Sequence, residues 1–212
     1  MATYMTFMMK ALSKMQDRRS VLFGLAAIGA ASVFPMRAFA FSPAQAEAQI
    51  TKVVADITSI INSGKPVSSM IGSFERLFAT YADVPRVAQL VLGADNRRAT
   101  PAERTAFAKS FQGYMARKYG KRFRDFAGGT VEVTGAREVK SFQEVQAVAK
   151  LPGKAPFAVS FMVSDKSGRD KFFDLLIEGI SLLKSERAEI GAMLDKRGGN
   201  IDAMIADLKQ AG

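Results

Sequence analysis

The sequence has 212 residues, with 30 Lys or Arg, 20 Asp or Glu, and no His, Cys or Trp. Without Cys there can be no disulfide or thiolate nucleophile, and without His there can be no imidazole metal ligand or Ser-His-Asp triad. Charged residues make up 24% and hydrophobic residues 48%, which is typical of a globular chain. We therefore expect a folded, basic protein with no metal and no cofactor, for which carboxylate, Lys, Ser or Tyr chemistry, or no chemistry, is left open by the composition.

Residues 1–40 have the pattern of an export signal that is removed. Basic residues precede a 14-residue apolar run from Val21 to Phe34, and Ala38-Phe39-Ala40 is a small-x-small cleavage site. The run is shorter than the ~20 residues that a membrane-spanning helix needs. The pair Arg18-Arg19 resembles a twin-arginine signal, and the general secretion route is the alternative. We expect residues 41–212 to form a single mature domain outside the cytoplasm.

The mature chain is less basic than the full sequence. Removal of residues 1–40 takes away five basic residues and one acidic residue, which leaves 25 basic and 19 acidic residues and a net charge of +6. We expect no nucleic acid partner for an exported chain. The basic excess has two interpretations, namely solubility and attraction to anionic membrane surfaces.

Helical periodicity covers residues 42 to about 119. Ser42, Pro43 and Gln45 form a start signal that predicts a helix to about Asn62. A second helix is predicted with Phe74 and Phe78 on its apolar face, and a third over 84–92. Thr100-Pro101 followed by Glu103 predicts the start of a helix that continues to about Tyr119. Its apolar stripe consists of Phe107, Phe111, Tyr114 and Met115.

The period changes to two after Gly128-Gly129. Apolar residues alternate in four successive segments around Val131–Val133, Val145–Leu151, Phe157–Val163 and Phe173–Ile177. This pattern predicts an antiparallel meander with one apolar face. Two further helices are predicted, from Ser185 to about Lys196 and after Asn200. The predicted fold class is α+β, with helices packed on one face of a four-stranded antiparallel sheet.

Two blocks of the mature chain resemble the MlaC family, also called the toluene-tolerance family. The first block contains Phe173-Asp174, Glu178-Gly179-Ile180-Ser181-Leu182 and Arg187. The second contains Val91-Leu92-Gly93, Thr100-Pro101, Arg104, Phe107, Phe111, Tyr114 and Tyr119. The sequence departs from the family at Asp170, where the family usually has Trp, and this indicates a divergent branch.

The resemblance implies a periplasmic phospholipid carrier without enzymatic activity, acting as a monomer. Such a carrier would shuttle lipid between an outer-membrane lipoprotein complex and an inner-membrane Mce-type ABC transporter, and so maintain the lipid asymmetry of the outer membrane. A carrier of a polycyclic, sterol-like or hopanoid lipid is one alternative. A periplasmic binding module, or an enzyme without His or Cys chemistry, is another.

The resemblance also implies an apolar lipid pocket between the sheet and the helices. We expect Phe107, Phe111 and Tyr114 to face the sheet residues across it, although an aromatic stripe at helical spacing is also typical of an ordinary core. The predicted lipid-binding residues are Phe74, Phe78, Phe107, Phe111, Tyr114, Phe161, Val163, Phe173 and Leu175.

The family motif residues Asp174, Glu178, Ser181 and Arg187 have a catalytic and a structural interpretation. If both carboxylates lie on a strand, four residues apart, they are about 13 Å apart, which is too far for the paired-carboxylate chemistry of glycosidases. Ser181 lacks a His to activate it and the second Gly of a nucleophile elbow. We favour the structural interpretation, in which Arg187 pairs with Glu178 or Asp174 and so joins the sheet to the following helix. Gly179, which follows Glu178, is also a residue of the family motif.

A basic run ends the predicted aromatic helix. It consists of Arg117, Lys118, Lys121, Arg122 and Arg124. Cations at this position either complement the negative end of the helix or bind anionic head groups or an acidic partner.

Overall fold

The computed structural model describes residues 41–212, and the predicted export signal lies outside the described residues. The α-helices are α2 (Pro43–Ile61), α3 (Val67–Tyr81), α4 (Val84–Leu92), α5 (Pro101–Gly120), α6 (Leu182–Lys196) and α7 (Ile201–Leu208). Two short 3-10 helices follow α4 and α5, at Gly93–Arg97 and Phe123–Phe126. The strands are β1 (Thr130–Val139), β2 (Phe142–Lys150), β3 (Phe157–Ser164), β4 (Lys171–Ile177) and β5 (Ile180–Ser181).

The predicted helix starts at Ser42 and Thr100 are both confirmed. The Ser42 hydroxyl accepts the N–H of Gln45 at 3.3 Å, and the Gln45 side chain accepts the N–H of Ser42 at 2.9 Å. Thr100 and Glu103 form the same reciprocal pair at the start of α5. These bonds satisfy N–H groups that have no partner within the helix, which explains why α2 and α5 begin where the sequence predicts.

The strands form one antiparallel sheet in the order β1-β2-β3-β4-β5. The α+β class is confirmed, but the prediction of four strands is wrong, because the described sheet has a fifth. After β4 the chain reverses through Glu178 and Gly179, which both have positive φ (50° and 78°), and β5 then pairs with the end of β4. A strand of two residues is too short to show a period of two, so the pattern could not predict it.

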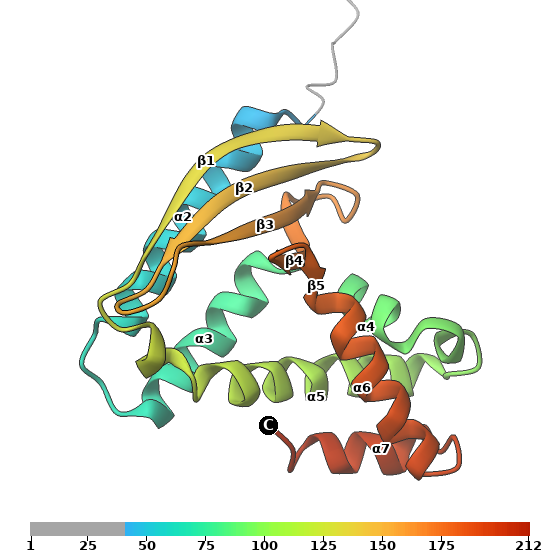
Figure 1. Ribbon diagram of the computed structural model, residues 1–212. Coiled ribbons are helices and arrows are strands. Elements are labelled where there is room, and N and C mark those ends of the chain that lie inside the picture. The colour runs from blue at the N-terminus through green and yellow to red at the C-terminus, as the bar shows by residue number, and fades with distance from the viewer. Residues whose placement is uncertain (1–40) are drawn as a thin grey trace, which may run out of the picture. The chain divides into compact units, whose positions relative to one another are not determined.

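The helices cover one face of the sheet and extend beyond the β4 edge (Figure 1). Helix α2 packs along β1 and β2, and α3 packs against both α2 and α5. Helices α4, α6 and α7 group around α5, and α4 and α6 also contact β4. No helix within residues 41–212 is long and apolar enough to cross a membrane.

The buried apolar side chains form two clusters rather than one. The sheet cluster joins the inner face of the sheet to α2 and consists of Ala46, Ile50, Val53, Leu77, Val145, Ala147, Ala149, Val159, Phe161 and Val163. The helix cluster contains residues of the helices from α3 to α7, and its buried members include Phe78, Phe107, Phe111, Tyr114, Met115, Ile190, Met204 and Leu208. Phe172 in β4 packs against both clusters, so this residue marks their junction.

A β-bulge in β4 places Phe172 at this junction. The pairing of β3 with β4 shifts between Met162 and Val163, so that Val163 pairs with Phe172 and Met162 pairs with Asp174. Phe173 is the extra residue. Because a bulge changes which residues share a face, Phe172 and Leu175 both pack against the sheet cluster.

Candidate functional site

A small cavity lies in the helix cluster next to the junction. Its volume is about 40 Å³. Residues from α3, α4, α5, β4 and α6 surround it, and all are apolar except Asp174 and Glu186. The lining residues are Phe78, Val87, Val91, Phe111, Met115, Phe172, Phe173, Asp174, Leu175, Leu182, Leu183 and Glu186.

Four of the nine predicted lipid-binding residues line the cavity, namely Phe78, Phe111, Phe173 and Leu175. The other five lie elsewhere in the two apolar regions: Phe107 and Tyr114 are buried in the helix cluster, Phe161 and Val163 are buried in the sheet cluster, and Phe74 packs against the sheet cluster. A lipid contact for any of the nine stays a prediction.

The expected arrangement, in which the α5 stripe faces the sheet residues across a pocket, is found for Phe111, which lines the cavity together with Phe173 and Leu175, whereas Phe107 and Tyr114 do not line it. The Phe172 ring lies close to rings on both sides of the junction, with its centroid 6.1 Å from that of Phe161 and 6.2 Å from that of Phe78. The alternation pattern predicted Phe173 on the apolar face and missed Phe172. Two adjacent Phe residues in an alternating strand were the available signal, because one of them must break the alternation unless the strand bulges.

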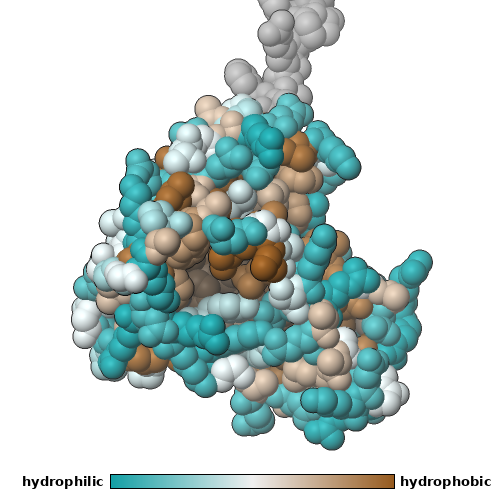
Figure 2. Space-filling view, viewed as in Figure 1, coloured by the Kyte–Doolittle hydropathy of each residue, from teal (hydrophilic) through white to brown (hydrophobic). Residues whose placement is uncertain are grey.

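A groove on the surface adjoins the cavity. It runs beside the β4–β5 hairpin, and its lining includes Phe142, Met162, Ile180 and Lys184. Phe173 and Asp174 line both the groove and the cavity, and we call this pair the shared wall. The hairpin also carries two exposed apolar side chains, Ile177 and Ile180. Figure 2 shows apolar side chains gathered between α5 and the sheet, where the surface is hollowed.

Two cations lie beside the shared wall. The guanidinium carbon of Arg86 lies 4.2 Å from the centroid of the Phe173 ring, and Lys184 lines the groove. The Nη1 atom of Arg86 is buried and has no hydrogen-bond partner among the described residues. Positive charge therefore lies beside the aromatic ring of the shared wall.

Asp174 joins β4 to the start of α6. Its Oδ1 accepts the N–H of Leu183 at 2.9 Å, and its Oδ2 accepts the Ser181 hydroxyl at 2.6 Å. The Ser181 hydroxyl in turn accepts the N–H of Lys184 at 3.1 Å and caps α6. A carboxylate at a helix N-terminus is favourable because it satisfies free N–H groups and complements the helix dipole. Asp174 and Ser181 thus have structural partners, and α6 starts at Leu182, three residues before the predicted start.

Glu178 lies in the turn after β4 rather than on the strand, so the premise that Asp174 and Glu178 share a strand is wrong. The backbone N–H of Glu178 donates to the carbonyl of Ala158 at 2.9 Å, and its carboxylate accepts the N–H of the same residue. Both carboxylates are engaged by local donors of the fold.

The expected pairing of Arg187 with Asp174 or Glu178 is also wrong. Arg187 is exposed and forms no ion pair within residues 41–212. Its guanidinium lies against Gly93, the residue that ends α4, where an added Cβ would come within 2.5 Å of Nη2. Gly93 has φ 60° and ψ −120°, a conformation that glycine tolerates best.

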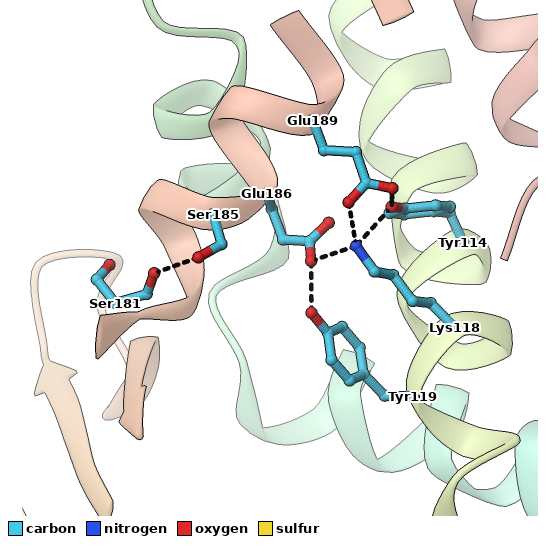
Figure 3. A network of polar contacts seen from close by, with 7 residues as sticks. All are labelled: Tyr114, Lys118, Tyr119, Ser181, Ser185, Glu186 and Glu189. Carbon is cyan, nitrogen blue, oxygen red and sulfur yellow. Dashed lines mark hydrogen bonds and ion pairs between the residues drawn. The ribbon is translucent and has the colours of Figure 1, made fainter. Parts of the chain in front are cut away.

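A polar cluster joins α5 to α6 and was not predicted from the sequence (Figure 3). It consists of Tyr114, Lys118, Tyr119, Glu186 and Glu189. The Lys118 ammonium donates to Glu186 Oε1 at 2.8 Å, to Glu189 and to the Tyr114 hydroxyl, while the Tyr119 hydroxyl also donates to Glu186 Oε1. The Glu186 side chain is 2% exposed. A signal was present in the i, i+3 spacing of the two Glu residues, but their partners lie 67 to 75 positions away.

The polar cluster shifts the pKa values of its members. Hydrogen bonds from Lys118 and then from Tyr114 lower the pKa of Glu189. Burial opposes the charge of Lys118, but its hydrogen bonds to both carboxylates outweigh burial and raise its pKa. Burial, followed by hydrogen bonding to Glu189, raises the pKa of Tyr114. Lys118 therefore stays charged in the fold at neutral pH.

Most of the predicted basic run serves the fold. Arg117 donates to the carbonyls of Leu208 and Ala211 at the end of α7, at 2.6 and 2.8 Å, and Lys121 donates to the carbonyl of Gly212. Lys118 belongs to the polar cluster. Arg122 and Arg124 are exposed, and both interpretations of the basic run stay open for them.

The fold and the site define an α+β domain whose apolar interior is divided at β4 and contains a small cavity. The family model described as "MlaC protein" matches residues 51–210. The chain therefore belongs to the MlaC family.

Two relatives extend this assignment. The MlaC binding protein of the intermembrane phospholipid transport system of Haemophilus influenzae is 23% identical over 136 residues, which are 62% of this chain and 63% of that protein. A phospholipid-binding protein from Ralstonia solanacearum, solved in complex with a phospholipid, superimposes with a TM-score of 0.67 at 20% identity. That match covers 78% of this chain and 95% of the solved chain, and it supports the fold.

Proposed function

We propose that the mature domain is a periplasmic carrier that takes up a phospholipid at the junction of its two apolar clusters. It would pass lipid between an outer-membrane complex and an inner-membrane Mce-type ABC transporter, and so maintain outer-membrane lipid asymmetry. Family membership and the phospholipid named for both relatives support this proposal. The cavity at the junction is the single observation in the structure that carries it.

A carrier solves a physical problem. A diacyl lipid that crosses water alone exposes some thirty methylene groups, and at about 0.8 kcal/mol each this costs on the order of 25 kcal/mol. Unassisted transfer is therefore negligible. A protein reduces this cost when it offers apolar surface to the acyl chains and keeps the phosphate in water.

The cavity must enlarge to accept acyl chains. Its volume is about 40 Å³, whereas pockets for small molecules usually measure about 300–1,000 Å³. We propose that the helix cluster and the sheet cluster separate at Phe172, so that acyl chains replace the contacts between them. Because apolar contacts are exchanged for other apolar contacts, the free-energy change is smaller than for opening a core to water.

The shared wall is a suitable place for a lipid to enter the cavity. Phe173 and Asp174 lie between the groove and the cavity. The exposed Ile177 and Ile180 add apolar surface on the side of the groove. We propose that the lipid enters past Phe173, with its phosphate held outside near Arg86 and Lys184. The Nη1 atom of Arg86 is buried and has no partner among the described residues, and we propose that it becomes accessible to the phosphate when the wall opens, because guanidinium groups bind phosphate oxygens strongly.

Native mass spectrometry of the protein purified from a bacterial periplasm tests this function, followed by extraction of bound lipid. We expect a bound species with the mass of a phospholipid, and reloading of the delipidated protein from phosphatidylethanolamine vesicles. Arg86→Gln should reduce reloading, whereas Arg169→Gln serves as the control, because it removes an exposed charge that lines neither the cavity nor the groove. A lipid-free mass together with no uptake from vesicles would contradict the carrier function.

A further inference from the structure

Glu186 has a buried carboxylate oxygen without a hydrogen-bond partner among the described residues. Its Oε1 atom accepts from Lys118 and Tyr119, as Figure 3 shows, but its Oε2 atom is buried and has no partner among the described residues. Glu186 also lines the cavity. A buried acceptor without a partner costs free energy, so this oxygen favours a ligand group that donates a hydrogen bond.

The second carboxylate in the cavity lining does not share this property. Both oxygens of Asp174 accept hydrogen bonds, from Leu183 and Leu175 on one side and from Ser181 on the other. Within the described lining, the Oε2 atom of Glu186 is thus the carboxylate oxygen that is left for a ligand.

The lining also restricts the chemistry of the donor. Its charged members, Asp174 and Glu186, are both acidic, and the remaining lining residues are apolar. A lipid phosphate would meet two carboxylates and no cation there, which disfavours it strongly. An ammonium that is attached to a head group would bring that phosphate along. An aliphatic hydroxyl is neutral, donates one hydrogen bond and fits an apolar surrounding.

We propose that Glu186 is a specificity residue that selects a lipid with a hydroxyl on its apolar part. The hydroxyl donates to Oε2 when the acyl region occupies the enlarged cavity. This inference rests on the proposed carrier function and adds the class of cargo. The hydroxyl has two possible sources, a hydroxylated acyl chain and the ring hydroxyl of a polycyclic lipid, and both present the same donor.

A water molecule in the cavity would leave the preference for a hydroxyl unchanged. The cavity has room for a water molecule, which could donate to Oε2 in the absence of lipid. An acyl methylene that displaces such a water cannot replace its hydrogen bond, whereas a hydroxyl can. The hydroxylated lipid is therefore favoured over the same lipid without the hydroxyl, whether the empty cavity holds a water molecule or not.

The test is competitive loading of the delipidated protein. One arm uses vesicles with equal amounts of distearoyl phosphatidylcholine and a counterpart whose chains carry one hydroxyl at carbon 3, 7, 12 or 17. The other arm uses phosphatidylcholine vesicles with equal amounts of cholesterol and cholestane. Mass spectrometry of the extracted lipids gives the ratio of hydroxylated to plain lipid in each arm.

Glu186→Met and Glu189→Met form a matched pair of variants. Each removes one carboxylate that Lys118 contacts, but only Glu186 lines the cavity. We expect the parent and Glu189→Met to prefer the hydroxylated lipid about tenfold in at least one arm, equivalent to about 1.4 kcal/mol. Glu186→Met should load both lipids equally. The arm that shows the preference identifies the source of the hydroxyl.

Two results would overturn the inference while leaving the carrier function intact. One is equal loading of both lipids by the parent protein in both arms. The other is a preference that persists in Glu186→Met. The parent ratio decides the question even if Glu186→Met does not fold. Failure of the parent to take up any lipid in either arm would overturn the carrier function, and this inference with it.

Discussion

The sheet cluster and the helix cluster differ in how their interiors are built. In the sheet cluster, Val145, Val163 and Ile50 are fully buried, and they line neither the cavity nor the groove. The helix cluster contains a cavity, and next to it lie the buried carboxylate of Glu186 and a Lys118 side chain that is 27% exposed. A region with unfilled volume and polar ties between helices can rearrange at lower cost than a solid apolar layer. We propose that the helices move around a lipid while the sheet and α2 stay fixed.

The largest expected effect comes from the polar cluster. Lys118→Met should reduce the free energy of unfolding by about 3 kcal/mol, because it leaves the buried charge of Glu186 without its cation. We expect the double variant Lys118→Met, Glu186→Met to regain most of that loss. Urea denaturation of the single and double variants measures it, and Lys109→Met is the control at an exposed site on the same helix. A single variant as stable as the parent would show that the cluster does not hold α5 to α6.

Enlarging a side chain in each cluster sharpens the comparison. Val145→Phe should cost about 1–3 kcal/mol, because this position in the sheet cluster is fully buried and lines neither the cavity nor the groove. Val91→Phe should cost less than about 1 kcal/mol, since Val91 lines the cavity, and it should reduce lipid loading. Thermal melting and extracted lipid are measured on both variants. Equal destabilisation with unchanged lipid would mean that the two interiors do not differ.

The polar cluster also predicts how stability depends on pH. The folded pKa of Glu189 is lowered from its ordinary value of 4.5, so its contribution is present above that value and is lost as pH falls through the folded pKa. The pKa of Lys118 is raised from 10.5, so its contribution is present below that value and is lost only at higher pH. Melting temperature should therefore fall on acidification below about pH 4.5, and Glu189→Gln should show a smaller fall.

The size of this effect is limited by solvent. The Glu189 side chain is 49% exposed, so we expect its share to be below about 1 kcal/mol. A melting profile of Glu189→Gln that parallels the parent throughout the acid range would assign the acid sensitivity to other carboxylates.

The smallest effect is expected at Arg187. Because this side chain is exposed and has no ion pair within residues 41–212, Arg187→Ala should change stability by less than about 0.5 kcal/mol. The motif-based interpretation paired Arg187 with Glu178 or Asp174, which implies a larger loss where such a pair is deeply buried. A drop in melting temperature comparable to that of Lys118→Met would restore the motif-based interpretation.

Local signals predicted most of the fold. Capping residues identified the starts of α2 and α5, and alternation identified the four long strands, because these features depend on residues a few positions apart. Two features failed for physical reasons. The β5 strand has too few residues to show a period, and the bulge at Phe173 exchanges the faces that alternation assigns.

The site was less predictable because its contacts are distant in sequence. Glu186 carries no local mark of burial, since the partners that neutralise it, Lys118 and Tyr119, come from another helix. The division of the apolar core was equally hidden. Phe161 and Phe111 were both predicted to line one lipid pocket. Only the path of β4 divides them between two clusters, with Phe172 at the junction.

Hydrogen exchange tests the central claim most directly, namely that lipid enters at the junction through movement of the helices. Exchange is compared between the delipidated protein and the protein loaded from phosphatidylethanolamine vesicles. We predict altered exchange in α4, α6 and the Phe172 region of β4, with β2, β3 and α2 unchanged. Altered exchange in β2, β3 and α2 with no change in α4 and α6 would contradict the claim and place the lipid against the sheet cluster.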